Sequence, residues 1–306
     1  MIKVMKYSDL MAVNPEEINS PIYTELWENE YSPYVNPNPR YVNEAIIDSN
    51  QRTEIVRITK LLTIFTFATE KQLVSLPEVD QDLLDYLVKQ KIINKFTLGQ
   101  KDKNNQVKKD MEDVVWFYTM NYVGLNVVIS YLPELAPIAY EWNLGKVRKD
   151  FSFIYEKLIL LDFYLKEPID TATHMSKLLE FHTPEVVYAV SGNMNRFDFS
   201  FYTKQELTYF GHIGFVIYPF QETSVLNATV IDQIKKYMIN EQYYLRSFPK
   251  ANTNPEIILM VFSKEQADQI RNYIYLNDAN IPYDRIRFIN ARKLQKLDGI
   301  KNTSLV

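Results

Sequence analysis

Residues 51–124 place three short helical patterns directly before two strand patterns, and this order constrains the fold more than any other feature of the chain. A first helix is predicted from Gln51 onward, because its apolar residues fall on one helical face. Thr69 and Gln72 have the spacing of a capping box. They therefore predict a short second helix that ends near Leu76.

The third helical pattern and the two strand patterns complete this order. Asp80 can cap a third helix over Gln81–Gln90, whose leucines and valine share one face. Strands are predicted at 92–97 and 114–120, on either side of the polar residues 98–113. Three helices followed by a β-hairpin are typical of a winged helix-turn-helix, which places its third helix in the major groove of duplex DNA.

The predicted third helix and hairpin carry side chains suited to DNA. Glutamine can read adenine edges, and lysine can contact phosphates. We expect the DNA-binding residues to be Gln81, Tyr86, Lys89, Lys91, Lys95, Lys101, Lys103, Lys108 and Lys109. Asp82 and Asp85 lie on the same helix and would repel phosphates. A winged helix that binds protein, or one that acts as a transcriptional regulator, therefore remains an alternative.

Residues 1–50 form a Pro-rich acidic arm with 3 basic and 8 acidic side chains. Proline blocks regular strand pairing, so much of the arm is predicted to be extended or turn. The arm also contains Trp27 and several tyrosines, which are unusual in disordered segments. We expect it to pack on its own domain or on another protein of the same assembly.

Residues 125–306 predict a second domain of the α+β or α/β class. A helix over 149–165 and a shorter one over Thr171–Glu180 precede strands at 186–190, 196–203 and 213–220. In the second strand, Phe197, Phe199 and Phe201 are expected on one face. A helix, a strand, a helix opened by a Ser263–Gln266 capping box and a last strand follow, and this order predicts parallel strand pairs. The whole order is that of a restriction-endonuclease-like αβββαβ core.

Nucleases of this architecture need an acid on the second strand and an acid-x-Lys pair on the third, to hold Mg²⁺ and orient water. Asp198 occupies the first of these places, but the third strand has Val216, Tyr218 and Phe220 where the pair should be. Glu222 and Lys235 could replace the missing pair in a nuclease. We expect no catalytic residues and no cofactor. A Mg²⁺-dependent endonuclease or nickase that uses Asp198, Glu222 and Lys235 remains the enzyme alternative.

Several other chemistries lack their residues. The chain has no Cys, 3 His and 7 Gly, and it contains no glycine-rich nucleotide motif. Gly99, Gly124, Gly211 and Gly214 are predicted to occupy turns. The histidines do not have metal-ligand spacing, so no metal site is expected.

The C-terminal segment 235–306 has 12 basic and 7 acidic side chains. This excess could follow a phosphate backbone, or it could belong to a solvated terminal helix. The residues of this secondary basic surface are Arg285, Arg287, Arg292, Lys293 and Lys296.

Over about Gln51–Asn277 the chain resembles the replication-relaxation family of Gram-positive plasmids and mobile elements. The resemblance rests on Gln72-Leu73, Leu87–Lys95 (LVKQKIINK), Trp116–Gly124 (WFYTMNYVG) and the helix around Phe151–Leu165. It implies a winged helix joined to a nuclease-like domain, and DNA binding in replication, mobilisation or conjugative transfer. The third strand of the nuclease-like domain departs from the family pattern.

These patterns together predict a non-catalytic DNA-binding accessory protein of a mobile element, with double-stranded DNA as its partner. Its domains would be the arm 1–50, the winged helix 51–124 and a degenerate nuclease-like domain 125–306. No apolar run reaches the roughly 20 residues of a membrane helix, so we expect no membrane partner and a cytoplasmic location. A homodimer is compatible with this prediction.

Overall fold

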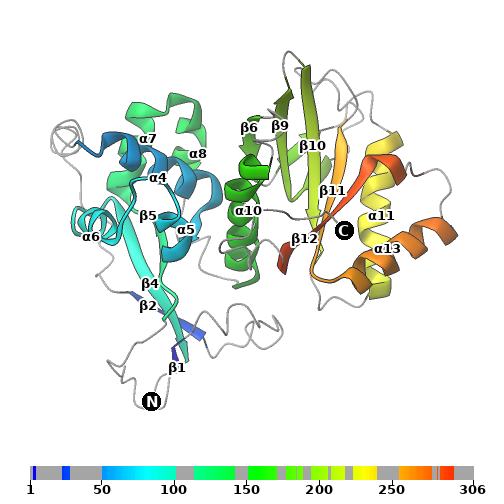
Figure 1. Cartoon of the computed structure of the whole chain (residues 1–306), viewed down its shortest axis with the longest axis horizontal. Helices are drawn as coiled ribbons and strands as arrows, with labels where there is room; N and C mark the ends of the chain where they lie inside the picture. The colour runs from blue at the N-terminus through cyan, green and yellow to red at the C-terminus, as the bar shows by residue number, and fades with distance from the viewer. Residues whose placement is uncertain are drawn as a thin grey trace. The chain divides into compact units, whose positions relative to one another are not determined.

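The computed structural model describes residues 3–4, 23–27, 50–100, 114–141, 151–170, 177–183, 185–188, 194–205, 208–217, 223–239, 255–277, 281 and 283–292. These residues form a mixed α+β structure (Figure 1). The chain divides into two compact units, Met1–Leu161 (unit 1) and Asp162–Val306 (unit 2). The boundary falls inside helix α10 (Phe151–Asp170), so each unit contains one part of that helix.

Unit 1 begins with the predicted helices, and their capping signals are confirmed. The elements are α4 (Arg52–Phe65), β3 (Phe67–Thr69), α5 (Glu70–Val74), α6 (Gln81–Lys89), β4 (Ile93–Gln100) and β5 (Phe117–Met120). Thr69 and Gln72 form the capping box of α5. The Asp80 carboxylate accepts a hydrogen bond from the Leu83 N–H at 2.8 Å and caps α6. Each cap satisfies N–H groups that have no partner within the helix.

The sheet of unit 1 is antiparallel, and its central strands are β4 and β5. β5 pairs with β4 on one side and with β3 on the other. Two short strands of the arm, β1 (Lys3–Val4) and β2 (Tyr23–Trp27), also pair with β4. These arm strands therefore pair with their own unit, which was one of the two expectations for the arm.

Unit 1 continues past residue 124, where the sequence predicted a domain boundary. Helices α7 (Tyr122–Tyr131), η1 (Pro133–Leu135) and α8 (Ala136–Glu141) follow β5, and α7 packs on α4. Val127 and Val128 of α7 are fully buried, and the Arg52 guanidinium lies 4.6 Å from the Tyr131 ring centre. Because α7 covers α4, both helices share the core of unit 1.

Unit 2 contains a five-stranded sheet in the order β12-β11-β10-β9-β6. β6 and β9 are antiparallel, as are β9 and β10, whereas β10, β11 and β12 are parallel to one another. The parallel pairs confirm the pairing predicted from the strand–helix–strand order. The elements after α10 are β6 (Lys177–His182), β7 (Glu185–Tyr188), β8 (Met194–Phe197), β9 (Phe199–Gln205), β10 (Thr208–Val216), α11 (Thr223–Ile239), β11 (Glu256–Val261), α13 (Lys264–Asn277), η3 (Tyr283–Arg285) and β12 (Ile286–Asn290).

Two sequence predictions for this unit are wrong. Residues 177–180, expected in a helix, belong to strand β6, because they pair with β9. Phe197 lies against Phe215 and Tyr237, whereas Phe199 and Phe201 lie against Phe163. The strand is interrupted at Asp198, and this interruption reverses the alternation of side chains.

The prediction that four glycines occupy turns is also wrong, and it concerns both units. Gly99 lies in β4, Gly124 in α7, and Gly211 and Gly214 in β10. Gly124 and Gly214 allow neighbouring groups to pack closely against the backbone. A Cβ on Gly124 would lie 2.4 Å from the Ile92 carbonyl oxygen, and one on Gly214 would lie 1.9 Å from the Phe199 ring.

Each face of the unit 2 sheet is covered by its own helices. α11 and α13 cover one face (Figure 1) and enclose a core that includes Ile213, Phe215, Ile234, Leu259 and Ile270. On the other face, Phe163 of α10 packs against Phe199 and Phe201. In the part of the chain that the structure describes, no helix combines the length and apolar character needed to cross a bilayer.

Candidate functional site

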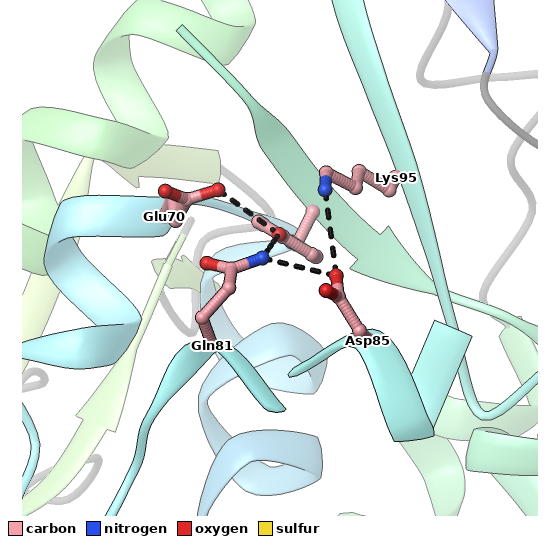
Figure 2. A network of polar contacts seen from close by, with 5 residues as sticks. Glu70, Gln81, Asp85 and Lys95 are labelled. Carbon is pink, nitrogen blue, oxygen red and sulfur yellow. Dashed lines mark hydrogen bonds and ion pairs between the residues drawn. The ribbon is translucent and has the colours of Figure 1, made fainter. Parts of the chain in front are cut away.

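A polar network lies between α6 and the sheet of unit 1 (Figure 2). The Gln81 amide nitrogen donates to Asp85 Oδ1 at 3.0 Å and to the Tyr118 hydroxyl at 3.4 Å. The Tyr118 hydroxyl donates to Glu70 Oε2 at 3.3 Å, and Lys95 Nζ lies 3.5 Å from Asp85 Oδ1. The network therefore connects the start of α5, the first two turns of α6, and strands β4 and β5.

The direction of these hydrogen bonds is set by chemistry. The carboxylates of Glu70 and Asp85 can only accept, so Tyr118 must donate to one and the Gln81 nitrogen to the other. Burial is the largest cause that raises the pKa of the Tyr118 hydroxyl, and both carboxylates raise it further, against the opposing hydrogen bond from Gln81. Tyr118 therefore stays protonated and keeps donating at physiological pH.

Lys95 belongs to this network and not to an open phosphate-binding surface. Its side chain is 9% exposed, and its ammonium lies 4.7 Å from the Trp116 ring centre while it pairs with Asp85. A lysine held between an aromatic ring and a carboxylate has little surface left for a phosphate. We therefore remove Lys95 from the set of expected DNA contacts.

The other predicted residues of α6 and its C-terminal turn lie at the surface. Lys89 and Lys91 are exposed, and Gln81 and Tyr86 are half-buried. Lys91 has φ 58°, in the left-handed region. Its N–H donates to the Val88 carbonyl at 3.0 Å, and the Ile92 N–H donates to the Leu87 carbonyl at 2.9 Å, as in a Schellman motif.

The remaining predicted DNA contacts can be placed only in part. Lys101, Lys103, Lys108 and Lys109 lie outside the described residues. In the secondary basic surface, Arg285 donates to the Pro255 carbonyl at 2.8 Å, Arg287 is half-buried, and Arg292 is exposed. Lys293 and Lys296 lie outside the described residues.

Asp198, the acid expected at a nuclease site, forms hydrogen bonds with backbone groups instead. Asp198 lies between β8 and β9, where its Oδ2 accepts from the Val216 N–H at 2.7 Å and its own N–H donates to the Gly214 carbonyl at 3.0 Å. The carboxylate thus holds the end of β10 against the interrupted strand. Glu222 lies outside the described residues, and Lys235 is half-buried on α11. Within the described ranges, no group of three or more His, Asp or Glu side chains could hold a metal ion.

A second polar cluster crosses the sheet of unit 2 and was missed by sequence analysis. His212 of β10 lies 2.8 Å from the Thr203 hydroxyl through Nε2 and 3.0 Å from Glu256 Oε2 through Nδ1. Its ring stacks on Phe201 at 4.5 Å. Hydroxyl, imidazole and acid also meet in nucleophilic catalysis, but here they project from three neighbouring strands, and the imidazole lies flat on a buried aromatic ring. We interpret the cluster as a cross-strand contact that joins β9, β10 and β11.

No sequence signal links these three residues. Thr203 and His212 lie on consecutive strands, Glu256 lies 44 residues after His212, and the pairing of β10 with β9 and β11 brings the three together. Comparison with known proteins adds no assignment: no family model, no curated protein and no solved structure matches the chain.

Proposed function

We propose that unit 1 is a winged helix-turn-helix that binds duplex DNA, and that the protein is a non-catalytic accessory factor of a plasmid or mobile element. The observation that carries the proposal is the order and pairing of the elements. Three helices with a short strand between the first two precede a β-hairpin, and β3, β5 and β4 pair in an antiparallel sheet. In this architecture α6 is the helix that enters the major groove.

The surface of α6 suits this task. Its apolar residues Leu83, Leu84 and Leu87 face the core, which leaves Lys89 at the surface and Tyr86 half-buried. Lys91 follows in the turn. Lysines at the C-terminal end of the helix can contact phosphates and orient the helix in the groove.

The backbone conformation of Lys91 supports a functional role for its side chain. The C′ position of a Schellman motif favours glycine, because a Cβ is strained at positive φ. Lysine occupies it here with φ 58°. A residue that keeps a side chain at a strained position is a candidate for a role other than stability, and an exposed ammonium beside α6 fits a phosphate contact.

Unit 2 fits a degenerate nuclease-like scaffold. Helix α10, the antiparallel strands β6, β9 and β10, helix α11 and the parallel strand β11 occur in the order of an αβββαβ core, which supports this interpretation, although the first of these strands is β6 and not the one predicted at 186–190. The carboxylate of Asp198 is engaged by a backbone N–H, which favours a structural over a catalytic role. The resemblance to the replication-relaxation family favours a role in replication, mobilisation or transfer.

A salt titration of duplex binding with lysine variants tests the proposal. We expect log K to fall linearly with log salt, and Lys89→Ala and Lys91→Gly each to reduce the slope by about 1. Lys91→Gly is informative because it should leave stability unchanged or raise it by up to about 1 kcal/mol, as strain at positive φ is relieved. Lost binding in this variant therefore cannot be ascribed to unfolding.

Lys264→Ala is the matched control, since Lys264 is an exposed lysine at the start of α13 in unit 2. It should bind as the wild type does. Equal binding by all four proteins would contradict the assignment of α6, and no duplex binding at any salt concentration would favour a protein-binding winged helix. Mg²⁺-dependent nicking of supercoiled plasmid that disappears in Asp198→Ala would establish the nuclease alternative instead.

A further inference from the structure

The network beside α6 leaves a fixed set of hydrogen-bonding groups on its outer side. Among the described residues, the Asp85 carboxylate accepts hydrogen bonds from Gln81 and from Lys95, and both go to Oδ1. Its side chain is 58% exposed, and Oδ2 has no partner among the described residues. Asp85 therefore offers one free acceptor at the surface of the helix.

The orientation of the Gln81 side-chain amide is also fixed by its hydrogen bonds. A primary amide has two N–H donors, and those of Gln81 go to Asp85 Oδ1 and to the Tyr118 hydroxyl. Reversing the amide would place its oxygen against the carboxylate, so the orientation is set. The side-chain carbonyl oxygen of Gln81 remains available for a further contact, and it too is an acceptor.

This arrangement changes the base that α6 can read. A glutamine recognises adenine by donating to N7 and accepting from N6, and it needs a free N–H to do so. In Gln81 both donors are already engaged, so the adenine contact predicted from sequence would require the network to break. Guanine presents only acceptors in the major groove and would face the negative carboxylate.

Cytosine presents the complementary group. Its N4 amino group donates into the major groove, and a carboxylate accepts from it. Lys95, buried against Trp116, holds Asp85 Oδ1 and does not itself reach outward. On the basis of the proposed DNA-binding function, we propose that Asp85, positioned by Gln81 and Lys95, is the specificity-determining residue of α6 and selects cytosine in the major groove.

The chain provides a matched control on the same helix. Asp82 is also exposed on α6, and it has no hydrogen bond or ion pair among the described residues. Asp82→Asn and Asp85→Asn each remove one negative charge from this surface. Both variants should gain non-specific affinity, because each removes a negative charge that repels phosphates. Only Asp85→Asn should change which base is preferred.

The experiment is selection from a randomised duplex library with the full chain at fixed salt, followed by affinity measurements on the selected site. We expect the wild type and Asp82→Asn to enrich cytosine at one position. Replacing that C·G pair by T·A, which exchanges the N4 donor for the O4 acceptor, should weaken their binding by about 5- to 150-fold. Asp85→Asn should bind both duplexes within about twofold, because an amide can donate to O4 as well as accept from N4.

The outcomes separate the two proposals. Duplex binding whose base preference is unchanged in Asp85→Asn would overturn the assignment of Asp85 while leaving DNA binding intact. A consistently selected adenine or guanine at the contacted position would overturn it as well. The absence of duplex binding by the wild type would overturn the proposed function, and the inference with it. Thermal unfolding of both variants checks that each remains folded.

Discussion

At the scale of single residues, Gly214 is the position where one added methyl group should disturb unit 2 most. Gly214 pairs with Phe199 across β10 and β9, and a Cβ built on it would lie 1.9, 2.3 and 2.4 Å from three atoms of the Phe199 ring. That ring cannot move freely, because it also lies against Phe163 and Phe181. The glycine is required by this close approach.

We expect Gly214→Ala to lower the free energy of unfolding by about 3 kcal/mol, since overpacked cores lose that order of stability. Urea denaturation measures the loss as a lower midpoint. In a Phe199→Leu background the same substitution should cost less than about 1 kcal/mol, because the ring that clashes is absent. Equal costs in the two backgrounds would show that the ring is not the obstacle.

The strand around Asp198 illustrates what the sequence pattern could predict about single residues and what it could not. The alternation of Phe197, Phe199 and Phe201 correctly predicted strand structure, but it placed all three on one face. The reversal depends on contacts of Asp198 with Gly214 and Val216 of another strand. Local periodicity contains no information about such contacts. For the same reason, the sequence could not show that Lys95 is buried against Trp116 and paired with Asp85.

At the scale of elements, both helices with a predicted capping box use the glutamine of the box for a second purpose. The Gln72 amide nitrogen donates to the Leu158 carbonyl of α10 at 2.8 Å, and that of Gln266 donates to the Ile217 carbonyl at 3.1 Å. In each case the amide oxygen accepts a backbone N–H at the helix start, from Thr69 and from Phe262. Glutamate could make the capping bond but could not donate to the second element.

Gln72→Glu should therefore keep the cap of α5 and still destabilise the protein. We expect a loss of about 2 kcal/mol, because a buried carboxylate would replace a donor opposite the Leu158 carbonyl. Gln269→Glu is the control, since Gln269 is exposed on α13, and it should stay within about 0.5 kcal/mol of the wild type. Similar urea midpoints for both variants would mean that the bond between Gln72 and α10 contributes nothing.

Sequence analysis was most successful with elements defined by local signals. The apolar faces and caps of α4, α5 and α6 lie within short stretches, so their bounds were close to those observed. Strand β6 was predicted as a helix because its identity depends on pairing with β9, which is distant in the chain. The polar network of the candidate site has the same origin, since it joins residues of four elements.

At the scale of the whole molecule, the division into two compact units predicts which fragment can fold. The sequence suggested an independent domain ending at residue 124, because the wing pattern ends there. The structure divides the chain inside α10 instead. Unit 1 includes α7, whose Val127 and Val128 are fully buried and which packs on α4, and the part of α10 in which Ile159 and Leu160 are fully buried.

We therefore expect a fragment 1–161 to unfold cooperatively and a fragment 1–124 to lack a cooperative transition. The shorter fragment loses most of α7 and all of α8, which pack on α4, and it therefore exposes apolar surface of the unit 1 core to water. Thermal unfolding followed by circular dichroism, with dispersion of amide signals in NMR spectra, distinguishes a folded fragment from a collapsed one. If 1–124 melts as sharply and at the same temperature as 1–161, then α7 and α10 are not part of the folding unit, and the boundary predicted from the sequence is the physical one. If only 1–161 folds, it is the fragment in which the DNA-binding proposal for α6 can be tested without unit 2.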